Sequence, residues 1–475
     1  MMKEAIPFLS ATELGAAIQR REVSPVEVTE AYLDRIQQVD GKLNAYITVC
    51  AAEARQAAKD AEAEIVRKRY RGPLHGVPVG VKDQIHTKGI ATTSGSRLRA
   101  EFIPEADATV VKRLKDAGAI VLGKLNMSEF ALGDPVNSAF GPAHNPWDLE
   151  RSPGTSSTGS GAATAGFLCA TSLGEDTGGS IRGPAANCGL VGLRPTWGRV
   201  SRAGVDGASW SVDTIGPVSR TVSDCAITIG AIAGYDPQDP YTYHAAVPDY
   251  RQSMTGDVRG IKVGLVREFL DPETCGVEPQ TRDAVLAAVQ VLRDLGAEVR
   301  EVSLPLAMQT GVIIRTITHT DRTSLHPEWL RERPQEYHPN TRVAFMTGTL
   351  LPAQVYYKAQ KLRELVRREV LAALQEVDVL VQPTSAAPAA KMDPNSRVRS
   401  KEQAKRALQE GSFRGPYSLS GVPALSILCG FTKEGPGALP LALQIAGRPL
   451  EEGTVLRVAH AYEQATPWHK RRPPV

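Results

Sequence analysis

Hydrophobic and polar positions follow helical spacing over the first 70 residues. The segment SPVE at 24–27 combines a serine cap, a proline at the first helical position and a glutamate three residues after the serine. It predicts a helix that ends near residue 40, and alanines interleaved with charged residues predict a second over about 51–69. We therefore expect peripheral N-terminal helices over residues 1–70.

From residue 77 the pattern changes to short apolar runs separated by amphipathic segments. The run VPVGV at 77–81 predicts a strand, 107–117 a helix closed by Gly118, and 119–122 another strand. Strand, helix and strand in succession are typical of an α/β sheet. The alternation returns later, with strands expected at 261–266, 298–302, 379–381, 424–428 and 441–445, and helices at about 280–295, 352–377 and 453–464.

The chain shows no short repeat and no linker that would divide it, so we expect one large α/β unit over residues 1–475. Its least patterned segments are 306–345 and 386–415, where prolines and mixed charges interrupt every period. Segments of this kind above a rigid sheet often shape a ligand pocket. We predict that these two are substrate-shaping insertions.

Composition narrows the class of protein. The 475 residues carry a formal net charge of +3, with 42% hydrophobic and 23% charged residues, as in an ordinary globular protein. No basic stripe favours nucleic acid or an anionic membrane as a partner. The six cysteines form no C-x-x-C pair, and we find no leader-like apolar segment and no run near the roughly 18 residues of a membrane span. A reduced, cytoplasmic location is expected.

The informative stretch is 152–183. SPGTSSTGSG at 152–161 and GEDTGGSIRG at 174–183 are rich in Gly, Ser and Thr, which suits an anion-binding loop or a site with a hydroxyl nucleophile. A phosphate loop is disfavoured because Ser160 and Gly161 stand where Lys and Ser/Thr are needed. The motifs G-x-S-x-G, S-x-x-K and H-E-x-x-H are absent, so two serine-hydrolase classes and a catalytic zinc are also disfavoured.

Serine chemistry without histidine needs another base, and Lys82 is the best candidate. It ends an apolar strand, where burial would lower its pKa toward the range useful for proton transfer. Asp83 would point to the opposite face of that strand. Considered alone, Lys82 would more simply be one half of an ordinary salt bridge.

Lys82 does not stand alone, because the sequence resembles the amidase signature family. The resemblance implies that family's fold, a central mixed β-sheet covered by helices, with a signature core over 73–225. Its motifs here are PLHGVPVGVKD at 73–83, NMSEFALG at 126–133, GPAHNPWD at 141–148, SPGTSSTGSG at 152–161, GEDTGGSIRGPAANCGLVGLRPTWGRVS at 174–201, TIGPVSRTVSD at 214–224 and PYSLSGVPALSI at 416–427.

The resemblance implies a Ser–cis-Ser–Lys triad, in which Ser180 matches the nucleophile, Ser156 the bridging serine after a cis peptide, and Lys82 the base. It also implies an oxyanion hole. The backbone N–H groups of this hole are those of Thr177, Gly178, Gly179 and Ser180.

Neighbouring residues have two interpretations each. Ser157 either relays protons or, as we favour, forms a hydrogen bond that holds the loop. Asp176 and Arg182 either contact the substrate or, more simply, hold the nucleophile loop through a bond to each other or to the backbone. Met127, Phe130 and Leu132 either line the acyl pocket or form a helical core stripe.

Two departures from the family pattern bear on function. Thr155 and Thr158 replace glycines of the usual serine loop, which affects loop shape more than activity. The segment 340–357 resembles the glutaminase subunit of tRNA-dependent amidotransferases, but Val343 and Ala344 stand where that subunit has an arginine pair. The group expected to hold the carboxylate of a free amino acid is therefore missing.

We accordingly expect a stand-alone amidase, a hydrolase of linear amides that cleaves the C–N bond of small or medium neutral amides through an acyl-enzyme. Carbamates (urethanes) and esters are further candidate substrates, since the same chemistry acts on acyl carbonyls. No metal or cofactor is expected, and the resemblance makes a homodimer reasonable. The alternatives are a non-catalytic binding protein and the glutaminase subunit.

Overall fold

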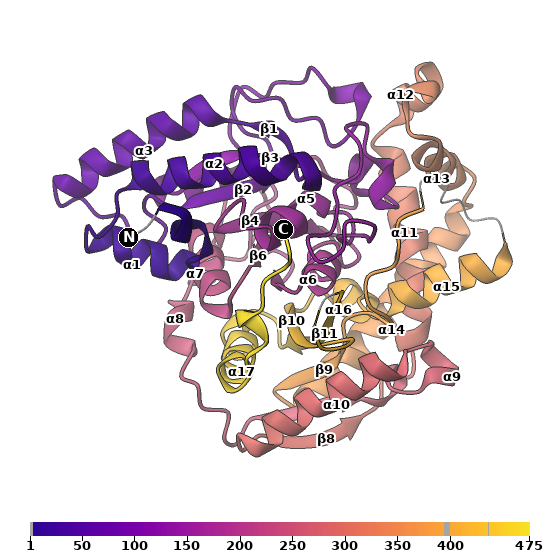
Figure 1. Cartoon of the computed structure of the whole chain (residues 1–475). Coiled ribbons are helices and arrows are strands. Elements are labelled where there is room, and N and C mark those ends of the chain that lie inside the picture. Colours follow the sequence, from indigo (N-terminus) through magenta and orange to yellow (C-terminus); the bar gives the residue numbers. More distant parts are fainter. Residues whose placement is uncertain (1–2, 394–399, 436) are drawn as a thin grey trace.

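The computed structural model describes residues 3–393, 400–435 and 437–475. At its centre is an 11-stranded sheet with the strand order β1-β3-β2-β4-β6-β5-β10-β11-β9-β7-β8 (Figure 1). The strands are β1 Tyr46–Val49, β2 Pro78–Lys82, β3 Ile120–Leu125, β4 Thr171–Asp176, β5 Val191–Arg194, β6 Thr214–Ser219, β7 Lys262–Val266, β8 Glu298–Val302, β9 Val379–Pro383, β10 Ala424–Phe431 and β11 Pro440–Gly447.

The sheet is mixed. Strand β2 lies parallel to β3 and β4, and β7 lies parallel to β8 and β9, whereas every pair between β4 and β9 in the sheet order is antiparallel. Because β5 pairs with β10, the N-terminal and C-terminal parts of the chain share one sheet and one core. The predicted α/β unit with a mixed sheet covered by helices is confirmed.

The N-terminal helices pack beside the β1 end of the sheet, at the upper left of Figure 1. The predicted cap is present, since the side chains of Ser24 and Glu27 each accept a bond from the other's backbone N–H. The helix runs three residues beyond the expected end near residue 40 and closes at Asn44, whose φ of 48° is left-handed. These elements are α1 Ala11–Gln19, α2 Pro25–Leu43 and α3 Ala51–Val66.

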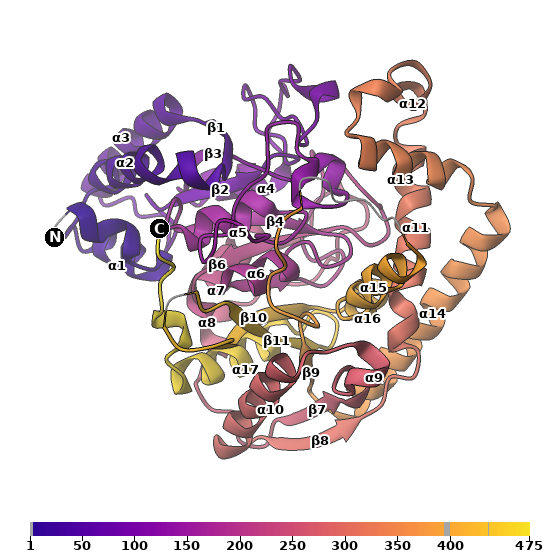
Figure 2. The same cartoon turned by 45° about the vertical axis from the view of Figure 1, so that its right-hand side comes forward.

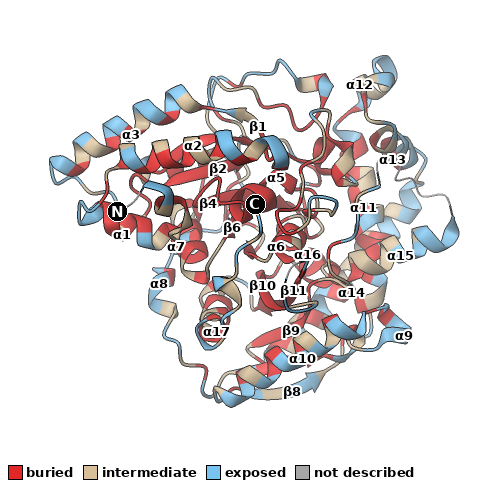
Figure 3. Ribbon diagram, viewed as in Figure 1, coloured by how far each residue is buried: buried red, intermediate tan, exposed pale blue. Residues whose placement is uncertain are grey.

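Helices cover the sheet, and the strands in its interior are buried, whereas β8 at its edge is largely exposed (Figure 3). Strands β2, β3 and β4 are buried along their whole length. The covering helices are α4 Thr109–Asp116, α5 Thr158–Ala165, α6 Arg182–Cys188, α7 Val222–Ile232, α8 Tyr250–Ser253, α9 Pro272–Cys275, α10 Pro279–Asp294, α16 Gly415–Ser420 and α17 Glu452–Ala465.

The segment between β8 and β9 is mainly helical, including the part over 306–345 whose sequence shows no clear period. Helices α11 and α14 run side by side along the edge of the molecule, and α13 packs against α11 (Figure 2). Helix α15 from the following segment also contacts α11. The bounds are α11 Thr310–Ser324, α12 Pro327–Glu332, α13 Pro339–Thr349, α14 Ala353–Glu376 and α15 Lys401–Ser412.

Short 3₁₀ turns connect these elements, at Lys3–Phe8, Arg97–Arg99, Glu129–Ala131, Pro135–Asn137, Arg267–Phe269, Ala307–Gln309, Pro334–Glu336 and Trp468–Lys470. Within the described residues, no helix has the length and apolar character needed to cross a membrane. All six cysteines are buried thiols.

Candidate active site

Three elements position the predicted triad. Lys82 is the last residue of β2, Ser156 lies in the loop that leads into α5, and Ser180 lies in the turn between β4 and α6. Strands β2 and β4 are parallel neighbours, so both end at the same edge of the sheet. The peptide bond between Thr155 and Ser156 is cis, as the resemblance implies.

Lys82 and Ser156 form a buried hydrogen-bonded pair. Lys82 Nζ lies 2.7 Å from Ser156 Oγ, and the lysine side chain is fully buried. Burial lowers the pKa of Lys82 below its ordinary value, while the nearby carboxylate of Glu175 opposes that shift. A lysine held in this way is closer to the neutral form than an exposed one at the same pH.

Glu175 is a member of the site that the sequence analysis missed. Its Oε2 lies 3.2 Å from Lys82 Nζ, and its Oε1 accepts the hydroxyl hydrogen of Thr177 at 2.7 Å. Residues 175 and 177 share one face of the strand and its extension, opposite to Asp176. The alternation of side chains along the strand could have identified Glu175 from the sequence, because it directs Glu175, rather than Asp176, toward Lys82.

A further carboxyl group, that of Asp213, completes the electrostatic surroundings of Lys82. Burial and the charge of Glu175 raise the pKa of Asp213 to about 7. Its Oδ2 accepts the backbone N–H groups of Ala208 and Ser209, each at 2.7 Å. Because the Glu175 and Asp213 carboxylates interact with each other and with the lysine, their charge influences the protonation of Lys82.

Ser157 lies against β4. Its hydroxyl donates to the carbonyl oxygen of Glu175 and accepts the N–H of the same residue, both at 3.3 Å. These bonds tie the serine loop to the strand that precedes Ser180. The contacts agree with the loop-holding interpretation of Ser157.

Asp176 and Arg182 bond to each other beneath the turn that carries Ser180. The Asp176 carboxylate accepts from Gly179 N at 2.8 Å, from Ile181 N at 3.2 Å, and from the guanidinium groups of Arg182 and Arg194. Burial alone would raise the pKa of Asp176, but these two arginines hold it well below its usual range. Asp176 is therefore an anion around which the turn is organised.

Arg182 connects this turn to the C-terminal part of the sheet. Its guanidinium donates to Gln444 Oε1 at 2.6 Å, to Ser418 Oγ at 2.7 Å and to the carbonyl oxygen of Arg414 at 3.0 Å. Strand β11 and helix α16 thus fix the position of the Ser180 turn from the other side.

The four backbone groups implied for an oxyanion hole are not equivalent. The Gly179 N–H is bonded to Asp176, as described, and Gly179 has a φ of +119°, which favours glycine. A side chain at Gly179 would also collide with Arg414. Gly179 therefore shapes the turn, and the remaining groups are those of Thr177, Gly178 and Ser180.

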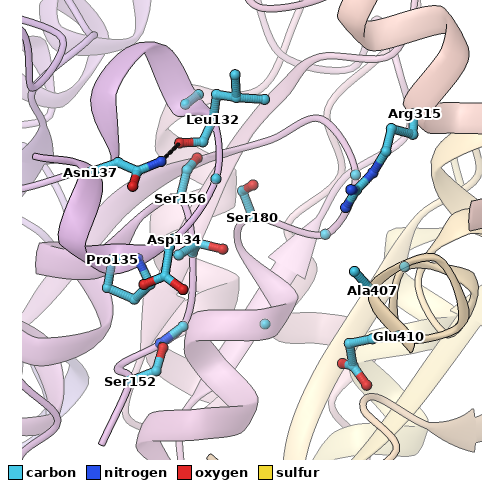
Figure 4. A pocket seen from close by; sticks show the side chains of 18 of the residues that line it. Leu132, Asp134, Pro135, Asn137, Ser152, Ser156, Ser180, Arg315, Ala407 and Glu410 are labelled. Atoms are coloured by element: carbon cyan, nitrogen blue, oxygen red, sulfur yellow. Dashed lines mark hydrogen bonds between the residues drawn. The ribbon is translucent and has the colours of Figure 1, made fainter. Parts of the chain in front are cut away.

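Ser156 and Ser180 both line a cavity of about 920 Å³ (Figure 4). Its wall also draws on the least patterned segments of the sequence, 306–345 and 386–415. From these segments come Gly311, Ile314, Arg315, Thr318, His319, Arg322, Asn340, Val343, Ala344, Ala387, Pro388, Ala390, Lys391, Met392, Ala407, Glu410, Gly411 and Arg414.

The three apolar residues proposed for the acyl pocket are placed differently. Leu132 lines the cavity. Phe130 instead packs against Tyr337 and Phe345, and Met127 packs with Ala131. The segment is a 3₁₀ turn with Phe130 in a left-handed conformation, so these residues form no continuous helical stripe.

The cavity wall offers no cluster suited to a metal. Across the described residues, no group of three or more His, Cys, Asp and Glu side chains is arranged to hold an ion. Cys188 packs with its thiol against the carbonyl oxygen of Pro153, and burial raises its pKa.

Comparisons with known proteins identify the family of the chain. The family model for Amidase matches residues 27–456. The chain is 40% identical over 98% of its length to a glutamyl-tRNA(Gln) amidotransferase subunit of Moorella thermoacetica, 98% of which is covered. Among solved structures, peptide amidase from Stenotrophomonas maltophilia superposes with a TM-score of 0.84 at 31% identity, with 98% of each chain covered.

A chain from a vestigial protein complex, described with the origins of an s-triazine catabolic enzyme, superposes with a TM-score of 0.87. It is 31% identical, and the match covers 96% of this chain and 98% of that one. Sequence motifs, sheet, cis peptide and comparisons thus agree, and the protein belongs to the amidase signature family.

Proposed function

We propose that the protein is a serine amidohydrolase in which Ser180 is the nucleophile, Ser156 the proton relay and Lys82 the base. The observation that carries the proposal is the buried 2.7 Å contact between Lys82 Nζ and Ser156 Oγ, at the cavity that Ser156 and Ser180 line together. A lysine whose pKa is lowered by burial is suited to accept a proton near neutral pH.

In the acylation step, neutral Lys82 takes the proton of Ser156 while Ser156 takes that of Ser180. The Ser180 oxygen forms a bond to the carbonyl carbon, and the C=O π pair moves to the oxygen. When the tetrahedral species collapses, the C–N bond breaks and the proton returns through Ser156 to the leaving nitrogen. Water then attacks the acyl-enzyme along the same relay, which releases the acid and restores the Ser180 hydroxyl.

The negative oxygen of the tetrahedral species needs donors that are already in place. We assign this role to the backbone N–H groups of Thr177, Gly178 and Ser180. The Gly179 N–H is excluded from the assignment because Asp176 accepts it. Asp176, Arg182 and Ser157 then act as positioning residues that hold the turn and the serine loop.

The substrate we propose is a small or medium-sized linear amide, cleaved without a metal or cofactor. Carbamates and esters are chemically accessible to the same acyl-transfer machinery. Val343 and Ala344 line the cavity, so the wall contributed by α13 is apolar at these positions.

A second candidate is the glutaminase subunit of an amidotransferase, favoured by the 40% identity to the amidotransferase subunit of Moorella thermoacetica. In that case glutamine would be the amide and the protein would work with further subunits on a tRNA-bound amino acid. Val343 and Ala344, which stand in place of an arginine pair, argue against it. We therefore rank the stand-alone hydrolase first.

The test is hydrolysis of a panel containing an aliphatic amide, an aryl amide, a carbamate, an ester and glutamine. Wild type, Ser180→Ala and Ser385→Ala are compared. Ser385 is a matched control because it lines the same cavity but bonds Arg414 rather than Lys82. We expect Ser180→Ala to lose turnover by about 10³-fold or more, and Ser385→Ala to retain most of it.

Turnover that persists in Ser180→Ala would contradict the assignment of the nucleophile. Turnover of glutamine alone would favour the glutaminase instead of the stand-alone hydrolase.

A further inference from the structure

One face of helix α11 forms a wall of the cavity. The residues that line the cavity from this helix recur every three or four positions, which places them on a single helical face. They are Gly311, Ile314, Arg315, Thr318, His319 and Arg322. The neighbouring stripe, with Ile313 and Ile317, packs into the core and fixes the orientation of the helix.

This wall carries guanidinium groups and no carboxylate. Burial and the two neighbouring arginines lower the pKa of His319 to about 3, so that its ring is neutral at neutral pH. The positive charge of the α11 wall is therefore that of Arg315 and Arg322.

Most cations that line the cavity are already engaged by the protein. Arg322 is buried and donates to the carbonyl oxygen of Ala131 at 3.0 Å. Arg414 is held by Thr384, Ser385 and Glu410, and Lys391 pairs with Glu150 at 2.6 Å. Each of these charged groups is therefore already bonded to other groups of the protein.

Arg315 is the exception among these four. Within the part of the chain that the structure describes, its guanidinium has neither an ion pair nor a hydrogen bond. The side chain is exposed to the cavity and extends from α11 toward the region of Ser180 (Figure 4). Ile314, the preceding residue, lies next to Gly178 of the proposed oxyanion loop, so this turn of α11 is adjacent to the reacting groups.

We propose that Arg315 binds a carboxylate at the far end of the substrate, so that the preferred amides are anionic. The inference rests on the proposed amide hydrolysis and adds the charge of the substrate to it. A planar guanidinium with several donors matches a carboxylate, and such charge-assisted bonds are among the stronger polar contacts. The inference replaces our expectation of a neutral substrate.

The test compares amides that differ only in that charge. Succinamate, glutaramate and adipamate are each paired with butyramide, valeramide and hexanamide, in which a methyl group replaces the carboxylate. Binding to Ser180→Ala is measured by calorimetry, and turnover by wild type is measured separately. We expect at least one carboxylate-bearing amide to bind about 10- to 100-fold more tightly than its neutral partner.

Arg315→Met in the Ser180→Ala background should abolish this preference, and Arg315→Lys should retain part of it. Lys391→Met is the matched control, because Lys391 lines the same cavity but is already paired with Glu150, and we expect it to keep the preference. With active enzyme, Arg315→Met should lower kcat/KM for the anionic amide and leave that for the neutral amide within about twofold.

Equal binding of all three pairs, or a preference that survives Arg315→Met, would overturn the inference. Failure of the proposed hydrolysis has a different signature, namely turnover that does not depend on Ser180. The binding measurement uses no turnover, so the two failures are distinguishable.

Discussion

The wall of the cavity that carries Ser156 and Ser180 differs from the wall formed by α11 in how its charges are neutralised. Behind the first wall, Lys82 and Asp176 are fully buried, and each has several partners within the protein. On the second, the exposed Arg315 has no protein partner among the described residues. The first arrangement fixes geometry, whereas the second leaves a charge available to a ligand.

The two walls also differ in their origin in the chain. The first is built on β2 and β4, two buried strands with neighbours on both sides in the sheet, where any change is restricted. The second is a helix at the edge, inserted between β8 and β9 (Figure 2). Substrate preference is therefore open to change without altering the strands that carry the chemistry.

The largest expected effect is on the first wall. Lys82→Met retains most of the side-chain volume but removes the base, so turnover should fall by about 10³-fold or more for every substrate, neutral or anionic. Steady-state kinetics with one amide of each charge measures it. A loss confined to anionic amides would show that Lys82 binds substrate instead.

Asp176→Asn should chiefly affect stability. It leaves Arg182 and Arg194 buried beside a neutral group, and loss of one member of such a cluster costs about 3–5 kcal/mol of the free energy of unfolding. Denaturant unfolding measures the loss. The control is Asp148→Asn, which removes a partly exposed pair with Arg151 and should cost about 1 kcal/mol or less.

Glu175→Gln should move the pH dependence of turnover. The base must be neutral, so activity falls as the pH decreases through the pKa of Lys82. The Glu175 carboxylate raises that pKa against the dominant effect of burial, with smaller contributions in the same direction from Asp213 and Asp176. Removing it should shift the acidic limb of the kcat profile to lower pH by about one unit or more. A lower plateau without any shift would assign Glu175 a purely structural role.

The smallest expected effect is that of Val343→Arg on the second wall. Val343 lines the cavity and is 63% exposed, so a longer side chain has room there. An added guanidinium should improve kcat/KM for anionic amides by about tenfold or less, and glutamine is included in the substrate panel. The free energy of unfolding should change by no more than about 0.5 kcal/mol. A large loss of stability would show that the two walls are coupled.

The sequence predicted best those elements that have an amphipathic pattern. The strand expected at 298–302 is β8 without change, and the helix expected over 352–377 is α14 within one residue at each end. Strands β4, β5 and β6 were not predicted, because they are buried along their whole length and contain small residues, so that no alternation marks them. Helix α11 is rich in Thr and Ile, which favour strands, and packing against α13, α14 and α15 determines its conformation.

The site, like the fold, contains some residues that a sequence pattern identifies and others that only the three-dimensional structure identifies. Lys82 and Ser156 were paired from motifs, and they lie in contact. Glu175, Arg194 and Arg315 were not singled out from the sequence. Glu175 and Arg194 act through ion pairs with residues on neighbouring parts of the sheet. The role proposed for Arg315 depends on its lack of a protein partner among the described residues. Local pattern identifies residues of a motif, but only the fold shows which charges remain without partners.

The contacts of Arg182 with Ser418 and Gln444 have a consequence for synthesis of the chain. The turn that carries Ser180 is supported by residues made more than 230 positions later, and β5 acquires its neighbour β10 equally late. A nascent chain that ends before α16 lacks Ser418, Gln444 and β10, and such non-local pairing forms slowly. We therefore expect a chain truncated before α16 to carry the serine motif without the contacts that position Ser180.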